Sequence, residues 1–189
     1  MQGGRVEIEL DEAPWRTLPV DAVVRAGVVL GREFDRATAR DLARALRRSE
    51  ALRTAGRALR FRDLSAKALD ERLARRSVPP AARAEAVEAL ERAGVLDDGR
   101  FAAGRAEALA GRGYGDAAIR ADLERQGVGP AGAEAAIAGL EPESVRAERI
   151  AARRGRTVTT ARYLAARGFE PELAEAVAGE LVAGDSEER

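Results

Sequence analysis

The chain has 189 residues, of which 46% are hydrophobic and 34% charged, with 32 basic and 32 acidic side chains. It contains neither cysteine nor histidine. This excludes disulfides, the common zinc and haem ligand sets, and nucleophilic catalysis of the Ser-His-Asp and Cys-His kinds. There is no apolar run of 18 residues and no signal-peptide pattern at the start, so we expect a cytoplasmic protein without metal or cofactor.

Residues 1–48 predict an N-terminal extension made of a β-hairpin and helices. In RVEIEL apolar and charged residues alternate, which is the pattern of a half-buried strand. The turn-like DEAP and the segment WRTL complete the hairpin, and we expect Trp15 to anchor it on the following helix. VDAVVRAG predicts a short helix that ends at Gly27. Asp35 is a good N-cap for the next helix, and Ser49 for the one after it.

Charge is unevenly distributed although the net charge is zero. The segment from Phe34 to Arg76 contains thirteen basic and six acidic residues, whereas residues 184–189 are mostly acidic. Such polarity favours a nucleic-acid or acidic protein partner. The simpler interpretation of the arginines on the helix from Asp35 is a solvated helix face.

One motif occurs three times: a leucine, two residues, Arg or Gln, a small residue, an apolar residue, any residue, and proline. The three copies are LARRSVPP (Leu73 to Pro80), LERQGVGP (Leu123 to Pro130) and LAARGFEP (Leu164 to Pro171). The small residue suits the left-handed end of a helix, and the proline suits the first turn of the next helix. The motif therefore predicts a helix, a short turn and a second helix each time.

These copies predict a mainly α fold built from three tandem three-helix repeats. The repeats are expected at residues 49–95, 96–140 and 141–183, and an acidic tail follows at 184–189. The first helices are expected at about 49–61, 98–111 and 142–154. No repeat has enough large apolar residues to fold alone, so neighbours must cover one another. We therefore expect an elongated, curved array that carries the small N-terminal β-hairpin and its helices.

LDDGRFA (Leu96 to Ala102), followed by RGYGDAAIRADL (Arg112 to Leu123), resembles the signature region of the RecX family of recombination regulators. The threefold helical repeat and the N-terminal extension are also similar to that family. The resemblance covers essentially the whole chain and is loosest in the third repeat, where Thr160 stands at a position expected to be apolar.

The resemblance implies a negative regulator of the RecA recombinase. RecX proteins bind the filament that RecA forms on single-stranded DNA, lie in its groove, and inhibit ATP hydrolysis and strand exchange or promote disassembly. Some also bind DNA directly, so single- or double-stranded DNA is a further expected partner. A membrane partner is not expected, and we expect a monomer.

The candidate contact residues are basic side chains of the repeats, together with the tyrosine between two glycines. They are Lys67, Arg72, Arg75, Arg112, Tyr114, Arg120, Arg125, Arg149, Arg153 and Arg154. Stacking of Tyr114 on a base is one interpretation, and packing at a helix–helix corner is the simpler one. Asp97 and Asp98 resemble a metal-binding pair, but capping of the helix that follows them explains both carboxylates.

Two other classes of function remain open in the sequence. An enzyme requires a convergent acid–base pair, and none stands out, so we expect no catalytic residues. An α-helical repeat adaptor or a DNA-binding protein that acts on a different partner has the same basic and apolar helical surfaces. The glycines of RGYGDAAIRADL do not predict a nucleotide site, because no strand precedes them and no lysine follows.

Overall fold

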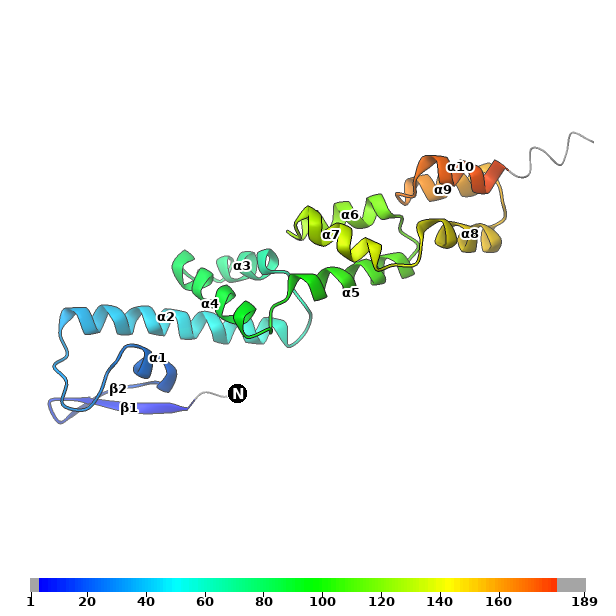
Figure 1. Cartoon of the computed structure of the whole chain (residues 1–189). Helices are drawn as coiled ribbons and strands as arrows, with labels where there is room; N and C mark the ends of the chain where they lie inside the picture. Colours follow the sequence, from blue (N-terminus) through cyan, green and yellow to red (C-terminus); the bar gives the residue numbers. More distant parts are fainter. Residues whose placement is uncertain (1–3, 180–189) are drawn as a thin grey trace, which may run out of the picture. The chain divides into compact units, whose positions relative to one another are not determined.

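The computed structural model describes residues 4–179, and the tail predicted at 184–189 lies outside these residues, as does the end of the third predicted repeat. The described part is mainly helical, as predicted, and contains two strands and ten helices (Figure 1). They are β1 (Arg5–Leu10), β2 (Ala13–Pro19), α1 (Val20–Arg25), α2 (Arg36–Leu59), α3 (Ala66–Ala74), α4 (Pro80–Arg92), α5 (Asp98–Gly111), α6 (Asp116–Arg125), α7 (Pro130–Ala138), α8 (Glu143–Arg154), α9 (Val158–Ala166) and α10 (Pro171–Gly179).

The chain divides into two compact units, one ending at Leu96 and the other beginning at Asp97. The first unit holds the hairpin and helices α1 to α4, and the second holds helices α5 to α10. Within residues 4–179, no helix combines the length and apolar character needed to cross a membrane.

The predicted hairpin is confirmed, but the role predicted for Trp15 is wrong. Ile8 pairs with Arg16 and Glu9 with Pro14, so Trp15 is the extra residue of a β-bulge. Its side chain is 38% exposed and meets Phe34, which precedes α2, edge-on with ring centroids 5.2 Å apart. Leu18 is buried instead, in the cluster that joins the hairpin to α1 and α2. The bulge therefore directs the tryptophan away from the core.

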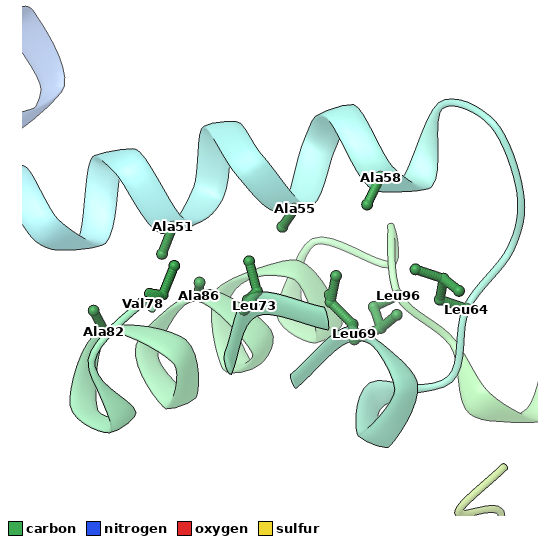
Figure 2. Close-up of a cluster of buried hydrophobic side chains, with 10 residues drawn as sticks. All are labelled: Ala51, Ala55, Ala58, Leu64, Leu69, Leu73, Val78, Ala82, Ala86 and Leu96. Atoms are coloured by element: carbon green, nitrogen blue, oxygen red, sulfur yellow. The ribbon is translucent and has the colours of Figure 1, made fainter. Parts of the chain in front are cut away.

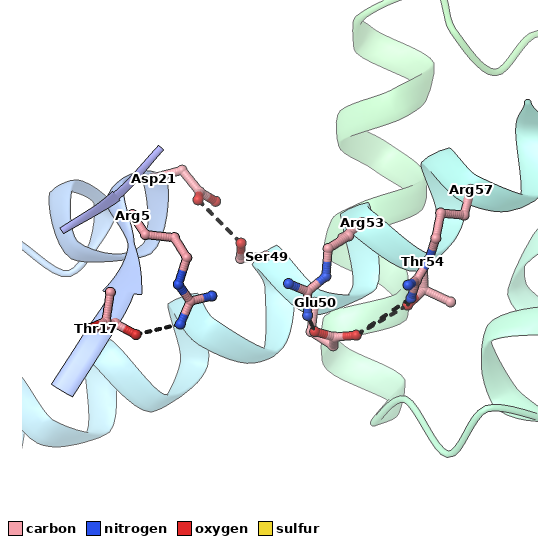
Figure 3. Close-up of polar contacts among 8 residues, drawn as sticks. All are labelled: Arg5, Thr17, Asp21, Ser49, Glu50, Arg53, Thr54 and Arg57. Atoms are coloured by element: carbon pink, nitrogen blue, oxygen red, sulfur yellow. Dashed lines mark hydrogen bonds and ion pairs between the residues drawn. The ribbon is translucent and has the colours of Figure 1, made fainter. Parts of the chain in front are cut away.

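Helix α2 is continuous across residue 49, where the sequence predicted the start of a new helix. Asp35 caps it as predicted and accepts a hydrogen bond from the Thr38 amide at 2.7 Å. Ser49 caps nothing, because its hydroxyl donates to Asp21 Oδ1 at 3.2 Å (Figure 3). The buried stripe continues in phase from Leu42 to Ala55, so no packing signal ends the helix at this point.

The first repeat packs small residues of two helices around the leucines of a third (Figure 2). Leu69 and Leu73 of α3 are fully buried between α2 and α4. The alanines around them are Ala51, Ala55 and Ala58 of α2, and Ala82 and Ala86 of α4. Alanine lets the helices approach closely, so a thin core excludes water with few large side chains.

The turn predicted from the threefold motif is confirmed in every copy. Ser77, Gly127 and Gly168 all have positive φ, at 58°, 87° and 79°. The final prolines are the first residues of α4, α7 and α10. The motif leucines Leu73, Leu123 and Leu164 are fully buried. Thr160 is buried at the position of Leu69 and Ile119, and its hydroxyl lies 3.3 Å from that of Thr157.

Candidate functional site

The glycine–tyrosine–glycine corner of the second repeat lies directly against the turn of the third repeat. The Gly115 amide donates to the Arg167 carbonyl at 2.9 Å, and the Ala117 amide donates to the Gly168 carbonyl at 3.2 Å. A Cβ on Gly115 would lie 2.3 Å from backbone atoms of Gly168 and Phe169. Only glycine allows two backbones to approach this closely. The motif therefore joins two repeats by their main chains.

Arg146 of α8 also contacts this corner, and each of its three guanidinium nitrogens donates a hydrogen bond. It is 3% exposed, and it donates to the Tyr114 carbonyl at 2.8 Å and to the Glu141 carbonyl at 3.0 Å. It also forms an ion pair with Asp116 at the start of α6. These contacts fix the backbone of Tyr114, which precedes the second glycine of the corner.

Beside this corner, three arginines and both tyrosines of the chain form a stack that we call the arginine–tyrosine ladder. Arg167 lies over both rings, 4.8 Å from the centroid of Tyr114 and 5.0 Å from that of Tyr163. Arg112 lies 5.8 Å from the Tyr114 centroid, and Arg154 lies 4.0 Å from the Tyr163 centroid. The order along the stack is therefore Arg112, Tyr114, Arg167, Tyr163 and Arg154. Arg112 follows α5, Arg154 ends α8, and Arg167 follows α9. Tyr163 lies on α9, and Tyr114 lies in the corner before α6.

Among the described residues, no carboxylate forms an ion pair with the arginines of the ladder, which are Arg112, Arg154 and Arg167. Arg167 also donates to the Arg112 carbonyl at 3.0 Å, which holds the central guanidinium in place. Each cation–π contact contributes about 0.5–1 kcal/mol at an exposed site and leaves the charge intact. Chemically, the ladder is a set of pre-positioned hydrogen-bond donors for carboxylates or phosphates.

The structure brings three of the ten predicted contact residues, Arg112, Tyr114 and Arg154, into the ladder. Tyr114 packs against the buried cluster at the helix–helix corner, which is the simpler of the two interpretations of this residue given above. Four other predicted arginines face carboxylates of their own unit: Arg75 with Glu71, Arg120 with Glu134, Arg125 with Asp122, and Arg149 with Glu141. Lys67 and Arg72 lie on α3, and Arg153 lies on α8.

Sequence reasoning missed Tyr163 and Arg167. A signal existed, because Arg167 directly precedes Gly168 in the third copy of the motif, and Tyr163 precedes its leucine. Tyr163 and Arg167 come close to Tyr114 only through contacts between residues about fifty positions apart, and no local sequence pattern predicts such contacts. Asp97, in contrast, caps α5 as predicted and accepts from the Arg100 amide at 2.9 Å.

Asp122 of the second unit is held by two arginines. Arg105 donates to both of its oxygens, at 2.6 and 3.1 Å, and Arg125 donates to one at 3.2 Å. The hydrogen bonds from Arg105 lower the pKa of Asp122 below the usual value of about 3.9, although partial burial opposes this. This carboxylate ties α5 to α6.

We expect Asp122→Asn to reduce the free energy of unfolding of the second unit by about 1–2 kcal/mol at neutral pH. The pKa of Asp122 is lower in the folded protein than in the unfolded chain, so between these two pKa values the unfolded chain binds more protons. The contribution of Asp122 to stability is therefore lost as the pH falls through the range between them. The difference between wild type and D122N should therefore be constant above about pH 5 and shrink below it. Denaturant unfolding at several pH values measures this, and a difference that grows on acidification would contradict it.

Comparison with known proteins gives matches of two kinds, although no family model matches the chain. In sequence, the chain is 40% identical over 80 residues to regulatory protein RecX of Xanthomonas axonopodis pv. citri (strain 306), and equally to that of Xanthomonas citri. The matched segment is 42% of this chain and 49% of each relative, so the match spans about half the length of these curated relatives.

Two solved structures share the fold. A crystal structure of regulatory protein RecX superimposes with a TM-score of 0.82 at 19% identity, covering 93% of this chain and 95% of that chain. The crystal structure of RecX from Lactobacillus salivarius gives a TM-score of 0.62 at 17% identity, covering 72% of this chain and 97% of that chain. At these identities the likeness shows the fold alone.

Proposed function

We propose that this chain is a RecX-family protein that regulates the RecA recombinase. The partial sequence match to RecX proteins supports the family, and the chain shares its fold with a RecX crystal structure. In this proposal it acts as a cytoplasmic monomer, lies in the groove of the filament that RecA forms on single-stranded DNA, and inhibits ATP hydrolysis and strand exchange. The arginine–tyrosine ladder is the observation that carries the proposal. It presents arginines that form no ion pair within the described residues, beside the corner formed by RGYGDAAIRADL.

The chemistry of the ladder suits a filament of protein on DNA. A guanidinium donates paired hydrogen bonds to carboxylates and phosphates, and such a filament offers both. The tyrosine rings hold Arg167 on both sides. Less side-chain freedom is therefore lost when a partner binds, which favours affinity.

The other predicted contact residues are proposed as secondary contacts. Ion pairs at the surface, such as Arg149 with Glu141, contribute about 0–1 kcal/mol. Arg125 is itself exposed, and Asp122 keeps its two hydrogen bonds from Arg105 if Arg125 turns to a partner. Partner carboxylates or phosphates can therefore replace the internal acidic groups at low cost. The same argument applies to Arg75 and Arg120, whose acidic partners are half-exposed.

The test uses the double variant Arg112→Gln, Arg154→Gln, which removes the two outer cations and leaves Arg167 between the tyrosines. Wild-type protein should inhibit ATP hydrolysis by RecA on single-stranded DNA at sub-stoichiometric concentration. The variant should need about tenfold more protein for half-inhibition, because two charged hydrogen-bonding groups are lost. Steady-state ATP hydrolysis and co-sedimentation with preformed filaments measure both effects.

A matched control is Arg100→Gln, Arg162→Gln, which removes two exposed cations of the same unit outside the ladder. It should inhibit like wild type. Equal potency of the two double variants would show that the ladder is not the contact site. If wild-type protein neither inhibits hydrolysis nor binds filaments, the regulatory function itself is wrong, and binding to DNA alone would then support the alternative of a DNA-binding protein.

A further inference from the structure

A cavity of about 320 Å³ lies in the first unit, where α1, α2 and α4 meet. Four arginine side chains from these three helices line it: Arg25, Arg44, Arg48 and Arg92. Arg25 and Arg92 are the last residues of α1 and α4, and Arg44 and Arg48 lie one turn apart on α2.

Arg48 is enclosed but has no hydrogen-bond partner within residues 4–179. Its side chain is 13% exposed, and its nearest carboxylate is that of Glu85, with 3.8 Å between Nε and Oε2. For comparison, Arg83 of the same unit donates to Asp70 at 2.8 Å. No fully buried side-chain nitrogen or oxygen of the described residues lacks a partner, so the unused donors of Arg48 keep some exposure. Arg48 is one of the residues that line the cavity.

Three carboxylates, those of Asp41, Glu85 and Glu88, also line the cavity, so its four cations exceed its acidic groups by one. Glu88 lies 3.7 Å from Arg92, its neighbour on the same helix, and within residues 4–179 Arg25 and Arg44 form no ion pair. Burial and the positive charge of Arg25 lower the pKa of Arg48, with a smaller contribution from Arg92, while Glu85 opposes them. Arginine stays protonated at neutral pH, so these cations repel one another across the cavity.

We infer that this cavity is a phosphate-binding site, in which the guanidinium groups of Arg25, Arg44 and Arg48 hold the oxyanion. A phosphate group has several oxygens for donors that arrive from different helices, and its charge relieves the repulsion between them. It would also connect α1 to α2. The site is in the first unit and does not depend on the proposed contact with RecA.

Two kinds of ligand carry such a phosphate group: the backbone of a nucleic acid and a free phosphorylated compound. Inorganic pyrophosphate probes the site itself, and a short fluorescent oligothymidylate probes the backbone. The variant is Arg25→Gln, Arg44→Gln. Both side chains are exposed and form no ion pair or hydrogen bond within the described residues, so their loss breaks neither. The control is Arg60→Gln, Arg76→Gln, which removes two exposed cations of the same unit outside the cavity.

Pyrophosphate at constant ionic strength should bind wild type and control with equal affinity, measured by calorimetry. It should also raise Tm by several degrees at about 100 times Kd. The cavity variant should bind at least about tenfold more weakly. If oligothymidylate binding falls in parallel, the source is nucleic acid; if it is unchanged while pyrophosphate binding is lost, the source is a free phosphorylated compound. No pyrophosphate binding, or equal binding by all three proteins, overturns the proposal.

Discussion

Gly115→Ala is expected to destabilise the second unit by about 3 kcal/mol or more. The new Cβ would lie 2.3 Å from the carbonyl carbon and oxygen of Gly168 and from the amide nitrogen of Phe169. All three are backbone atoms, which cannot rotate away as a side chain can. The two turns must therefore separate, and the hydrogen bonds from the Gly115 and Ala117 amides are lost.

Hydrogen exchange of the amides of α6 and α9 during mild denaturation measures this loss. Gly129→Ala is the matched control: Gly129 and Gly115 are both N-cap residues with extended backbone, at φ −67° and −82°, and a Cβ on Gly129 meets nothing within 4 Å. It should cost only about 0.5–1 kcal/mol, because alanine is a poorer N-cap than glycine but meets no steric clash there. Equal costs for the two variants would mean that the close approach at Gly115 is not needed.

Arg146→Met is expected to reduce the free energy of unfolding of the second unit by about 3 kcal/mol. Methionine preserves the aliphatic packing but removes the donors that satisfy the carbonyls of Tyr114 and Glu141 and the carboxylate of Asp116. The guanidinium also lies 5.8 Å from the centroid of the Phe169 ring, a contact that methionine replaces only in part. The cost comes mainly from buried acceptors left without a donor.

Denaturant unfolding of wild type, R146M and Arg146→Lys measures the effect. Lysine keeps the charge but not the fork of donors, so it should lie between the other two. The double variant R146M with Asp116→Asn tests the ion pair, because the two changes should be clearly non-additive. A loss below about 1 kcal/mol in R146M would mean that water replaces the guanidinium and that the residue does not hold the corner.

Most of the secondary structure could be predicted from the sequence, since its signals are local. The motif proline begins a helix because its missing amide hydrogen is unpaired there in any case, and Gly127 and Gly168 end helices because they adopt positive φ. The local signal at Ser49 was misleading. A serine suits an N-cap, but its hydroxyl bonds to Asp21 and α2 continues through it.

The candidate site was predicted only in part, because its members meet through tertiary contacts. Arg112, Tyr114 and Arg154 were chosen for charge and aromatic character near the glycine corner. Tyr163 and Arg167 complete the ladder only because the third repeat folds back onto that corner.

The sequence by itself determined the turns of the threefold motif, because the residues that form each turn lie within one or two turns of helix, and it carried the RecX resemblance. The tertiary structure decided why the corner contains glycine. Gly115 and Gly168 are 53 positions apart, and both must lack a Cβ for their backbones to touch. It also decided which arginines form an ion pair, since such a pair depends on where distant carboxylates come to lie.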